Sequence, residues 1–227
     1  MYQARLNDAA IVLYRVLERA GVNFGIFGGY AIAALGGPRE SKDIDCVASV
    51  TKAQIIALLD AKDGFAAVPQ GRQDYVAFLW SNTPNRKNAV LVEIFCEQFP
   101  GSQHSMRNLQ ATAVGVSGEV MGNGTSLVLD PFHLFKGKLR AAATRDKFHD
   151  SADLRWLESR FSQQIRARSA ELKPVYAGLA MKRYPELEIL LAPVGINVNA
   201  AKHAARNLDP NHLPSPAPGD VQEGLLG

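Results

Sequence analysis

The chain has 227 residues, of which 47% are hydrophobic and 21% are charged, and its formal net charge is +3. This length suits one large domain or two small ones, with enough chain to bury a sizeable core. The charge is too small to indicate nucleic-acid binding by itself, and the sequence holds no apolar run long enough to cross a bilayer.

The sequence also bears on the cellular compartment. Residues 1–8 do not have the form of a signal peptide. Cys46 and Cys96 are the only two cysteines, a count that fits reduced thiols in an intracellular protein. We therefore expect a cytoplasmic protein that does not associate with membranes.

Helices and strands are predicted to alternate in the first half of the chain. Apolar residues of 9–20 recur with helical spacing, and Thr51 is a suitable N-cap for another helix that runs through Leu59 and ends near Asp63-Gly64. A short helix is predicted at 30–35. Strands are predicted at 22–27, 43–50, 65–68, 75–80, 90–96, 111–116 and, as a hairpin-like return, 120–129. This pattern is typical of an α/β fold.

The sequence changes character near Asp130, which is a suitable N-cap for the first of several helices. Further helices are predicted at 148–161, at 164–183 with a kink or split at Pro174, from Pro185 onwards, and at 199–207. Residues 209–227 contain four prolines and no apolar periodicity, so disorder is expected there. We predict an α/β core at 1–129, a helical domain at 130–208 and a disordered tail at 209–227.

Two aspartates open the second predicted strand, in the sequence Asp43-Ile44-Asp45. Alternate residues of a strand share a face, so the two carboxylates should point the same way, about 7 Å apart. Like charges held together repel each other unless a cation lies between them. A hard metal ion such as Mg²⁺ suits carboxylate oxygens.

A third carboxylate, Glu93, lies among apolar residues of its predicted strand. A buried charge is costly unless it is paired or bound to a metal. One interpretation is an edge strand with Glu93 turned to solvent; the other is a cluster with Asp43 and Asp45 that holds one or two Mg²⁺ ions. By the same alternation, Cys46 and Cys96 should face a helix-packed core on the other side of their strands.

Glycines and basic residues flank the aspartates in the sequence. Gly28 and Gly29 stand between a strand and a short helix, where they either make a tight turn or bring backbone N–H groups to phosphates. Arg39 and Lys42 lie in the turn before Asp43, where they are either solvated or able to neutralise a triphosphate. The basic residues from Lys136 to Arg183 form either solvated helix faces or a surface for an RNA or phosphorylated acceptor.

In this order, the residues resemble the DNA polymerase β-type nucleotidyltransferase superfamily. Gly28-Gly29 matches the glycine pair at a helix start, Asp43-x-Asp45 matches the aspartates of the next strand, and Glu93 stands where a third acidic residue, more often Asp, is found. The helical segment resembles the one that follows the catalytic core in abortive-infection-type nucleotidyltransferases and small antibiotic-modifying relatives. Its matching residues are Lys138, Leu139, Arg145, Asp150 and Asp153. The resemblance covers about residues 22–157.

The resemblance implies a mixed sheet flanked by helices and followed by a helical region. It implies transfer of a nucleoside monophosphate from a nucleoside triphosphate to an acceptor hydroxyl or phosphate of a small molecule, RNA or protein, with Mg²⁺ or Mn²⁺ as cofactor and pyrophosphate as product. The implied catalytic metal ligands are Asp43, Asp45 and Glu93. The implied nucleotide-binding residues are Gly28, Gly29, Arg39, Lys42, Lys138, which meets the triphosphate, and Asp150, which supports the site.

Two other hypotheses stay open at this point. The protein could be a non-catalytic descendant of the same fold that acts as an RNA- or protein-binding module. It could also be a basic RNA-binding protein with an incidental acidic cluster.

Overall fold

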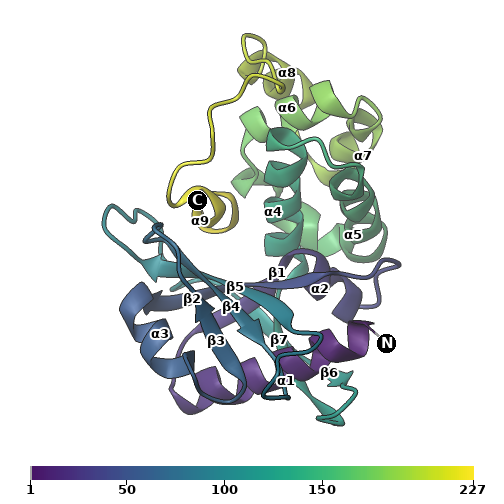
Figure 1. Cartoon of the computed structure of the whole chain (residues 1–227). Helices are drawn as coiled ribbons and strands as arrows, with labels where there is room; N and C mark the ends of the chain where they lie inside the picture. The colour runs from purple at the N-terminus through teal and green to yellow at the C-terminus, as the bar shows by residue number, and fades with distance from the viewer. Residues whose placement is uncertain (1) are drawn as a thin grey trace. The chain divides into compact units, whose positions relative to one another are not determined.

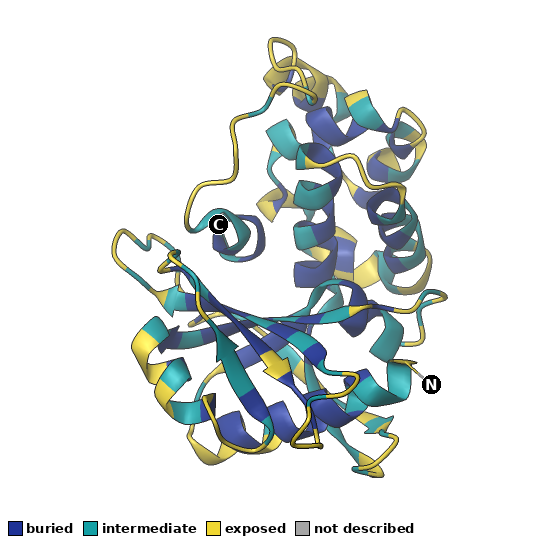
Figure 2. Ribbon diagram, viewed as in Figure 1, coloured by how far each residue is buried: buried dark blue, intermediate teal, exposed yellow. Residues whose placement is uncertain are grey.

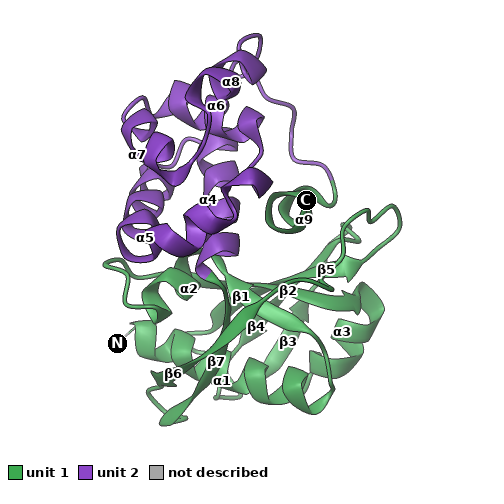
Figure 3. Cartoon of the chain, turned by 180° about the vertical axis from the view of Figure 1, so that it is seen from behind, with its two compact units in different colours: residues 1–130, 218–227 green, residues 131–217 purple. Residues whose placement is uncertain are grey.

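The computed structural model describes residues 2–227 and shows an α/β protein with one seven-stranded sheet. Two compact units divide the chain (Figure 3). Unit 1 holds residues 1–130 and 218–227, and unit 2 holds residues 131–217. The predicted fold class, a mixed sheet flanked by helices and followed by a helical region, is confirmed.

Unit 1 contains the sheet and the helices packed on it (Figure 1). In chain order its elements are α1 (Tyr2–Arg19), β1 (Phe24–Phe27), α2 (Gly28–Ala34), β2 (Asp43–Thr51), α3 (Lys52–Leu59), β3 (Phe65–Val68), β4 (Tyr75–Trp80), β5 (Val90–Gln98), β6 (Ala111–Ser117), β7 (Asn123–Leu129) and α9 (Asp220–Leu226).

The strand order in the sheet is β3-β4-β5-β2-β1-β7-β6. β2 runs parallel to β5, and β1 runs parallel to β7, while the other neighbours are antiparallel. β2 and β5 therefore lie next to each other in the interior of the sheet, with β1 and β4 on their outer sides.

The two faces of the sheet differ in burial. α1 and α3 pack against one face (Figures 1 and 2). Side chains with no exposed surface point to this face from β2 and β5: Ile44, Cys46, Val92, Ile94 and Cys96. Both cysteines thus face the helix-packed core, as predicted. Residues in between these on β2 and β5 point to the opposite face.

Local sequence explains where two of the helices begin. Thr51 caps α3 through a capping box, in which its hydroxyl accepts from Gln54 N at 3.2 Å and Gln54 Oε1 accepts from Thr51 N at 2.8 Å. This N-cap is the predicted one. α1 begins at Tyr2, earlier than the predicted start at residue 9, because Leu6 in its first turns is fully buried.

The regular elements of unit 2 are all helices. Its elements are α4 (Pro131–Thr144), α5 (Phe148–Ala167), the short 3₁₀ helix η1 (Ser169–Glu171), α6 (Pro174–Arg183), α7 (Leu187–Val194) and α8 (Val198–Ala204). α5 bends at Phe161, whose φ of −131° and ψ of 24° are not helical. The predicted split at Pro174 is confirmed, since this proline begins α6, where its missing N–H costs nothing.

The structure differs from the expectation of disorder at 209–227. Residues 220–226 form α9, and its Gln222 and Leu225 are buried. The sequence shows no apolar periodicity here because the helix has only seven residues and docks largely through polar groups. The prolines precede α9, where the chain has no regular helix or strand.

None of the helices in residues 2–227 combines the length and the apolar character that crossing a membrane requires.

Candidate functional site

Asp45 and Glu93 are register partners in the parallel pairing of β2 and β5. Asp43 lies two residues before Asp45 on β2, so its side chain points to the same face of the sheet. All three side chains are half-buried. The structure thus brings together on one face the three carboxylates that the sequence singled out.

The position of Glu93 excludes one of its two interpretations. β5 lies between β4 and β2, so Glu93 is not on an edge strand. Burial raises the pKa of Glu93, the charge of Asp43 raises it further, and the charge of Arg72 acts in the opposite direction. Ionisation of Glu93 is therefore less favourable than that of a solvated glutamate, and a bound cation would offset this difference.

The three carboxylates supply the oxygen donors that Mg²⁺ and Mn²⁺ prefer. By its chemistry the set formed by Asp43, Asp45 and Glu93 fits such an ion, and the repulsion between Asp43 and Glu93 favours a cation beside them. Within residues 2–227, no group of three or more His, Cys, Asp or Glu side chains stands in a geometry that could hold a metal ion. Metal binding would therefore require side-chain rotation at one or more of the three positions.

The glycine pair lets charged side chains approach the backbone. Gly28 has a φ of +72°, and a Cβ built there would lie 2.4 Å from Asp45 Oδ2. A Cβ on Gly29 would lie 2.7 Å from Arg39 Nη2 and 2.8 Å from Ser41 Oγ. Gly28 must adopt a positive φ and leave room for the Asp45 carboxylate. Only glycine meets both requirements, because other residues rarely adopt that φ and all of them carry a Cβ.

The two basic residues of the following turn differ in placement. Arg39 is half-buried against the glycine pair, whereas the Lys42 side chain is exposed. The backbone carbonyl of Lys42 accepts a hydrogen bond from the Tyr2 hydroxyl at 2.7 Å. Of the two predicted phosphate-binding side chains, Arg39 therefore lies near the Gly28-Gly29 turn, whereas that of Lys42 is exposed to solvent.

The other two predicted site residues, Lys138 and Asp150, belong to unit 2 and bind each other. Lys138 Nζ lies 2.9 Å from Asp150 Oδ1 and 2.7 Å from Asp153 Oδ2. Arg145 Nε lies 2.7 Å from Asp150 Oδ2. The side chains of Lys138, Asp150 and Asp153 are almost wholly buried, at 5%, 0% and 3% exposure.

The surroundings of Asp150 decide its charge state. Burial by itself would raise the pKa of Asp150, but the hydrogen bond from Arg145 and the charge of Lys138 outweigh it and hold the pKa below its usual range. Within unit 2 the Lys138 charge is thus balanced by two carboxylates. This network stabilises the packing of α4 on α5.

Other basic side chains of the helical region also pair within unit 2. Arg168 Nε lies 2.7 Å from Glu171 Oε1, and Arg155 Nη1 lies 3.3 Å from Glu186 Oε1. These partly exposed pairs favour the interpretation of solvated helix faces over that of a surface for an RNA acceptor.

A second polar cluster, which the sequence patterns do not indicate, lies at the start of β4, the strand that pairs with β5. Arg72 donates two hydrogen bonds to Asp74, Nε to Oδ1 at 2.9 Å and Nη2 to Oδ2 at 2.6 Å. The Arg72 guanidinium lies 5.0 Å from the centroid of the Tyr75 ring, which stacks on Phe95 at 5.4 Å. Phe95 follows Glu93 by two residues and so points to the same face. The only signal in the sequence is an Arg-x-Asp pair directly before a predicted strand, which is too common to single out.

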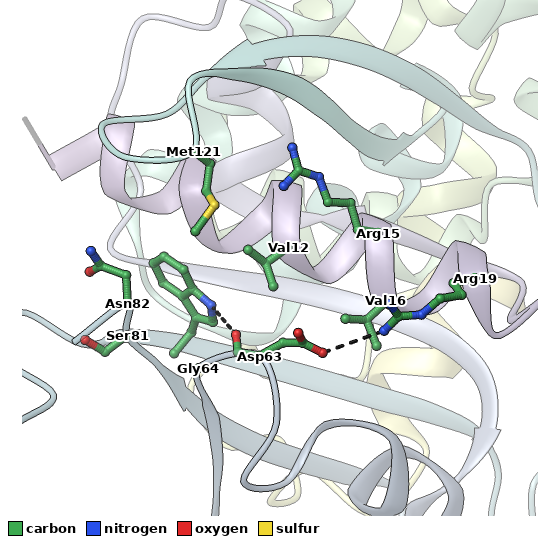
Figure 4. A pocket seen from close by; sticks show the side chains of 10 residues that line it. Val12, Arg15, Val16, Arg19, Asp63, Gly64, Ser81, Asn82 and Met121 are labelled. Atoms are coloured by element: carbon green, nitrogen blue, oxygen red, sulfur yellow. Dashed lines mark hydrogen bonds and ion pairs between the residues drawn. The ribbon is translucent and has the colours of Figure 1, made fainter. Parts of the chain in front are cut away.

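A pocket of about 430 Å³ lies away from these residues (Figure 4). Val12, Arg15 and Val16 of α1 line one side of it (Figure 4). On the other side, Trp80 Nε1 donates to the backbone carbonyl of Asp63 at 3.0 Å. The pocket contains no residue of the predicted site, and Trp80 is a core side chain with 1% exposure.

Comparison with solved structures decides the fold family. The structure matches the crystal structure of an antigenic nucleotidyltransferase-like protein from Paracoccidioides brasiliensis with a TM-score of 0.56 at 19% sequence identity, over 88% of this chain and 97% of that chain. The chain has a nucleotidyltransferase fold. The resemblance predicted from the sequence is therefore confirmed at the level of the fold.

Two structures of ANT(2″)-Ia also match. The solution structure of this antibiotic-resistance factor gives a TM-score of 0.49 at 17% identity, over 84% of this chain and 98% of that chain. The crystal structure of ANT(2″)-Ia in complex with adenylyl-2″-tobramycin gives 0.46 at 15% identity, over 77% and 95%. No protein-family model matches the sequence, and no curated protein matches it.

Proposed function

We propose that this protein is a metal-dependent nucleotidyltransferase that moves a nucleoside monophosphate from a nucleoside triphosphate to an acceptor hydroxyl. One observation carries the proposal: Asp45 and Glu93 are register partners on two interior parallel strands, with Asp43 on the same face. This arrangement occurs in a chain with a nucleotidyltransferase fold.

The proposed reaction joins the acceptor oxygen to the α-phosphorus of the nucleotide. The bond from that phosphorus to the bridging oxygen breaks, and pyrophosphate leaves with the electron pair. A carboxylate oxygen of Glu93, which lies on the same face of the sheet as Asp43 and Asp45, would accept the proton of the acceptor hydroxyl.

The remaining proposed roles are electrostatic. Asp43, Asp45 and Glu93 would hold Mg²⁺ or Mn²⁺, and such an ion supplies positive charge that neutralises the triphosphate. Arg39 and the backbone N–H groups of Gly28 and Gly29 would bind phosphate oxygens, because the glycines have no side chain of their own to cover these N–H groups and the Arg39 guanidinium lies close to Gly29.

Three of the roles that the resemblance implies stay predictions. Lys42 is exposed and free to move toward an anion, whereas Lys138 is engaged by two carboxylates. For Lys138 to bind the triphosphate, with Asp150 supporting it, the Lys138 ammonium group would have to contact phosphate while still paired with these two carboxylates.

The proposal is tested by titrating the purified protein with each of ATP, GTP, CTP and UTP in the presence of Mg²⁺, using calorimetry. We expect at least one nucleotide to bind, and Asp45→Asn to weaken its binding at least tenfold, which is about 1.4 kcal/mol. Glu188→Gln, an exposed change on α7, is the matched control and should leave binding unchanged.

Transfer is then followed with nucleotide labelled at the α-phosphate, using a panel of hydroxylated small molecules and the protein itself as acceptors. Labelling that Asp45→Asn abolishes would support the proposal. A folded wild-type protein that binds none of the four nucleotides would overturn it in favour of a non-catalytic binding module.

A further inference from the structure

The end of the chain returns to the sheet after unit 2. Residues 218–227 belong to unit 1, and α9 lies over the face of the sheet opposite to α1 and α3 (Figures 1 and 3). This is the face to which the three carboxylates point. The C-terminal helix therefore lies on the same side of the sheet as the candidate site.

Hydrogen bonds fix α9 to the first residue before β4 and to the end of β5. Gln222 Nε2 donates to the backbone carbonyls of Asp74 and Cys96, both at 2.9 Å. The backbone N–H of Gly219 donates to Asp74 Oδ2 at 2.9 Å. Gly219 has a φ of +87°, and a Cβ on it would lie 2.8 Å from the Phe99 ring, so glycine is required at this contact.

Asp74 joins α9 to the candidate site. Its carboxylate is fully buried and binds the Arg72 guanidinium through two hydrogen bonds as well as the N–H of Gly219. Arg72 in turn lies over the Tyr75 ring, and its charge acts on Glu93. The Tyr75 ring stacks on Phe95, which lies two residues after Glu93 on β5 and points to the same face of the sheet. A set of contacts within unit 1 thus runs from the last helix through Asp74, Arg72 and Tyr75 to Phe95, next to the proposed catalytic carboxylate.

The docking of α9 is not what a purely stabilising cap would use. A cap of this kind would bury apolar side chains alone, whereas α9 buries the amide of Gln222 completely beside the apolar Leu225. Its Oε1 has no hydrogen-bond partner among the described residues, at a cost of about 1–3 kcal/mol. Since both carbonyl contacts require the amide nitrogen on their side, rotating the amide group would not remove this cost.

We propose that Asp74 and α9 form a positioning clamp, which holds Arg72 over the Tyr75 ring on the face of the sheet that carries Glu93, so that the last ten residues of the chain complete the site. Asp74 is a positioning residue in this scheme, because it acts through Arg72. The inference rests on the proposed nucleotidyl transfer, since Glu93 is the residue that the clamp serves.

The test uses three variants: a chain that ends at Ala217, Asp74→Asn, and Arg72→Lys, which keeps the charge but loses the two-pronged contact. The control is Lys202→Ala, which removes an exposed ion pair with Glu188 in unit 2. The probe reaction is release of pyrophosphate with water as the acceptor, measured with the nucleotide that the wild type binds and Mg²⁺.

We expect all three variants to lower kcat at least tenfold while KM for the nucleotide changes less than threefold, and the control to match the wild type. An unchanged kcat in the truncated chain would overturn the clamp. So would a parallel loss of nucleotide binding and of melting temperature, because α9 would then serve stability alone.

A second measurement separates failure of the clamp from failure of the proposed function. Amide hydrogen exchange in residues 72–80 should rise in the truncated chain and in Asp74→Asn, while exchange in residues 148–167 of unit 2 stays the same. If the wild type binds no nucleotide, the proposed function fails and the exchange data decide the clamp: unchanged protection of residues 72–80 would refute it.

Discussion

Asp45 on β2 and Glu93 on β5 pair directly in the parallel register of two interior strands, so their side chains emerge side by side on one face of the sheet. This relationship has an energetic consequence. Burial and the neighbouring Asp43 both disfavour the ionised form of Glu93. In the protein without metal, the ionised Glu93 carboxylate therefore lowers the free energy of unfolding, which favours a functional reason for its presence.

Glu93→Gln should for this reason separate stability from activity. The change removes a disfavoured charge and keeps the side-chain volume, so we expect the free energy of unfolding without metal to rise by up to about 1 kcal/mol. Nucleotidyl transfer should fall by about 10²-fold or more, because the proton acceptor is lost. Urea unfolding and a labelled-nucleotide assay measure the two effects; a variant that transfers at the wild-type rate would show that Glu93 is not the proton acceptor.

Much of this site could be predicted because its parts leave clear marks in the sequence. Asp43 and Asp45 alternate with apolar residues on a strand, which is enough to place both on one face. Glu93 stands out because it is charged within an apolar run. The pairing of β5 with β2 was beyond prediction from spacing, because strand order depends on the packing of the whole sheet.

The elements that the sequence did not predict are held by polar contacts between segments far apart in the chain. α9 has only seven residues, and its docking depends on the Gln222 amide and the Gly219 N–H, neither of which produces a periodic pattern. Arg72 and Asp74 likewise lie in the loop before β4, and no local sequence pattern predicts the conformation of this loop. Hydrogen bonds between segments far apart in sequence leave no local signal.

Acid should weaken unit 2 through Asp150. Its pKa is held below the usual 3.8 in the folded state, so its contribution to stability is present above that value and is lost as the pH falls through the lower, folded pKa. We expect the melting temperature to fall between about pH 5 and pH 2, and Asp150→Asn to flatten this part of the profile. Glu40→Gln, at an exposed position, is the control. Equal slopes for Asp150→Asn and wild type would contradict the assignment.

Lys138→Met should destabilise the protein strongly. The Lys138 side chain is 5% exposed and binds Asp150 and Asp153, so its removal leaves two buried carboxylates without the ammonium group between them. We expect a loss of about 3 kcal/mol in the free energy of unfolding. Lys147→Met makes the same chemical change at an exposed position and should cost less than about 0.5 kcal/mol.

The same pair of variants bears on the role that the family resemblance implies for Lys138. Nucleotide affinity is measured at a temperature where both variants remain folded by circular dichroism. A loss of affinity in Lys138→Met alone would support a role at the triphosphate. Wild-type affinity in a folded Lys138→Met variant would limit Lys138 to the ion-paired network of unit 2.

Gly28→Ala should affect the site as well as the backbone, and Gly21 offers a matched control. Both glycines have a positive φ, +72° and +65°, so alanine is strained at each by about 1 kcal/mol. The difference lies in the surroundings. A Cβ on Gly21 meets nothing within 4 Å, whereas a Cβ on Gly28 would lie 2.4 Å from Asp45 Oδ2 and would displace this carboxylate.

We therefore expect Gly21→Ala to lower stability by about 1 kcal/mol and to leave nucleotide binding unchanged. Gly28→Ala should lower stability by a similar or larger amount and also weaken binding of nucleotide with Mg²⁺ by about tenfold, or about 1.4 kcal/mol. Calorimetric titration of both variants, next to urea unfolding, distinguishes the two effects. Equal nucleotide affinity in the two variants would mean that the close approach of Gly28 to Asp45 has no part in binding, and that the glycine serves only the turn from β1 into α2.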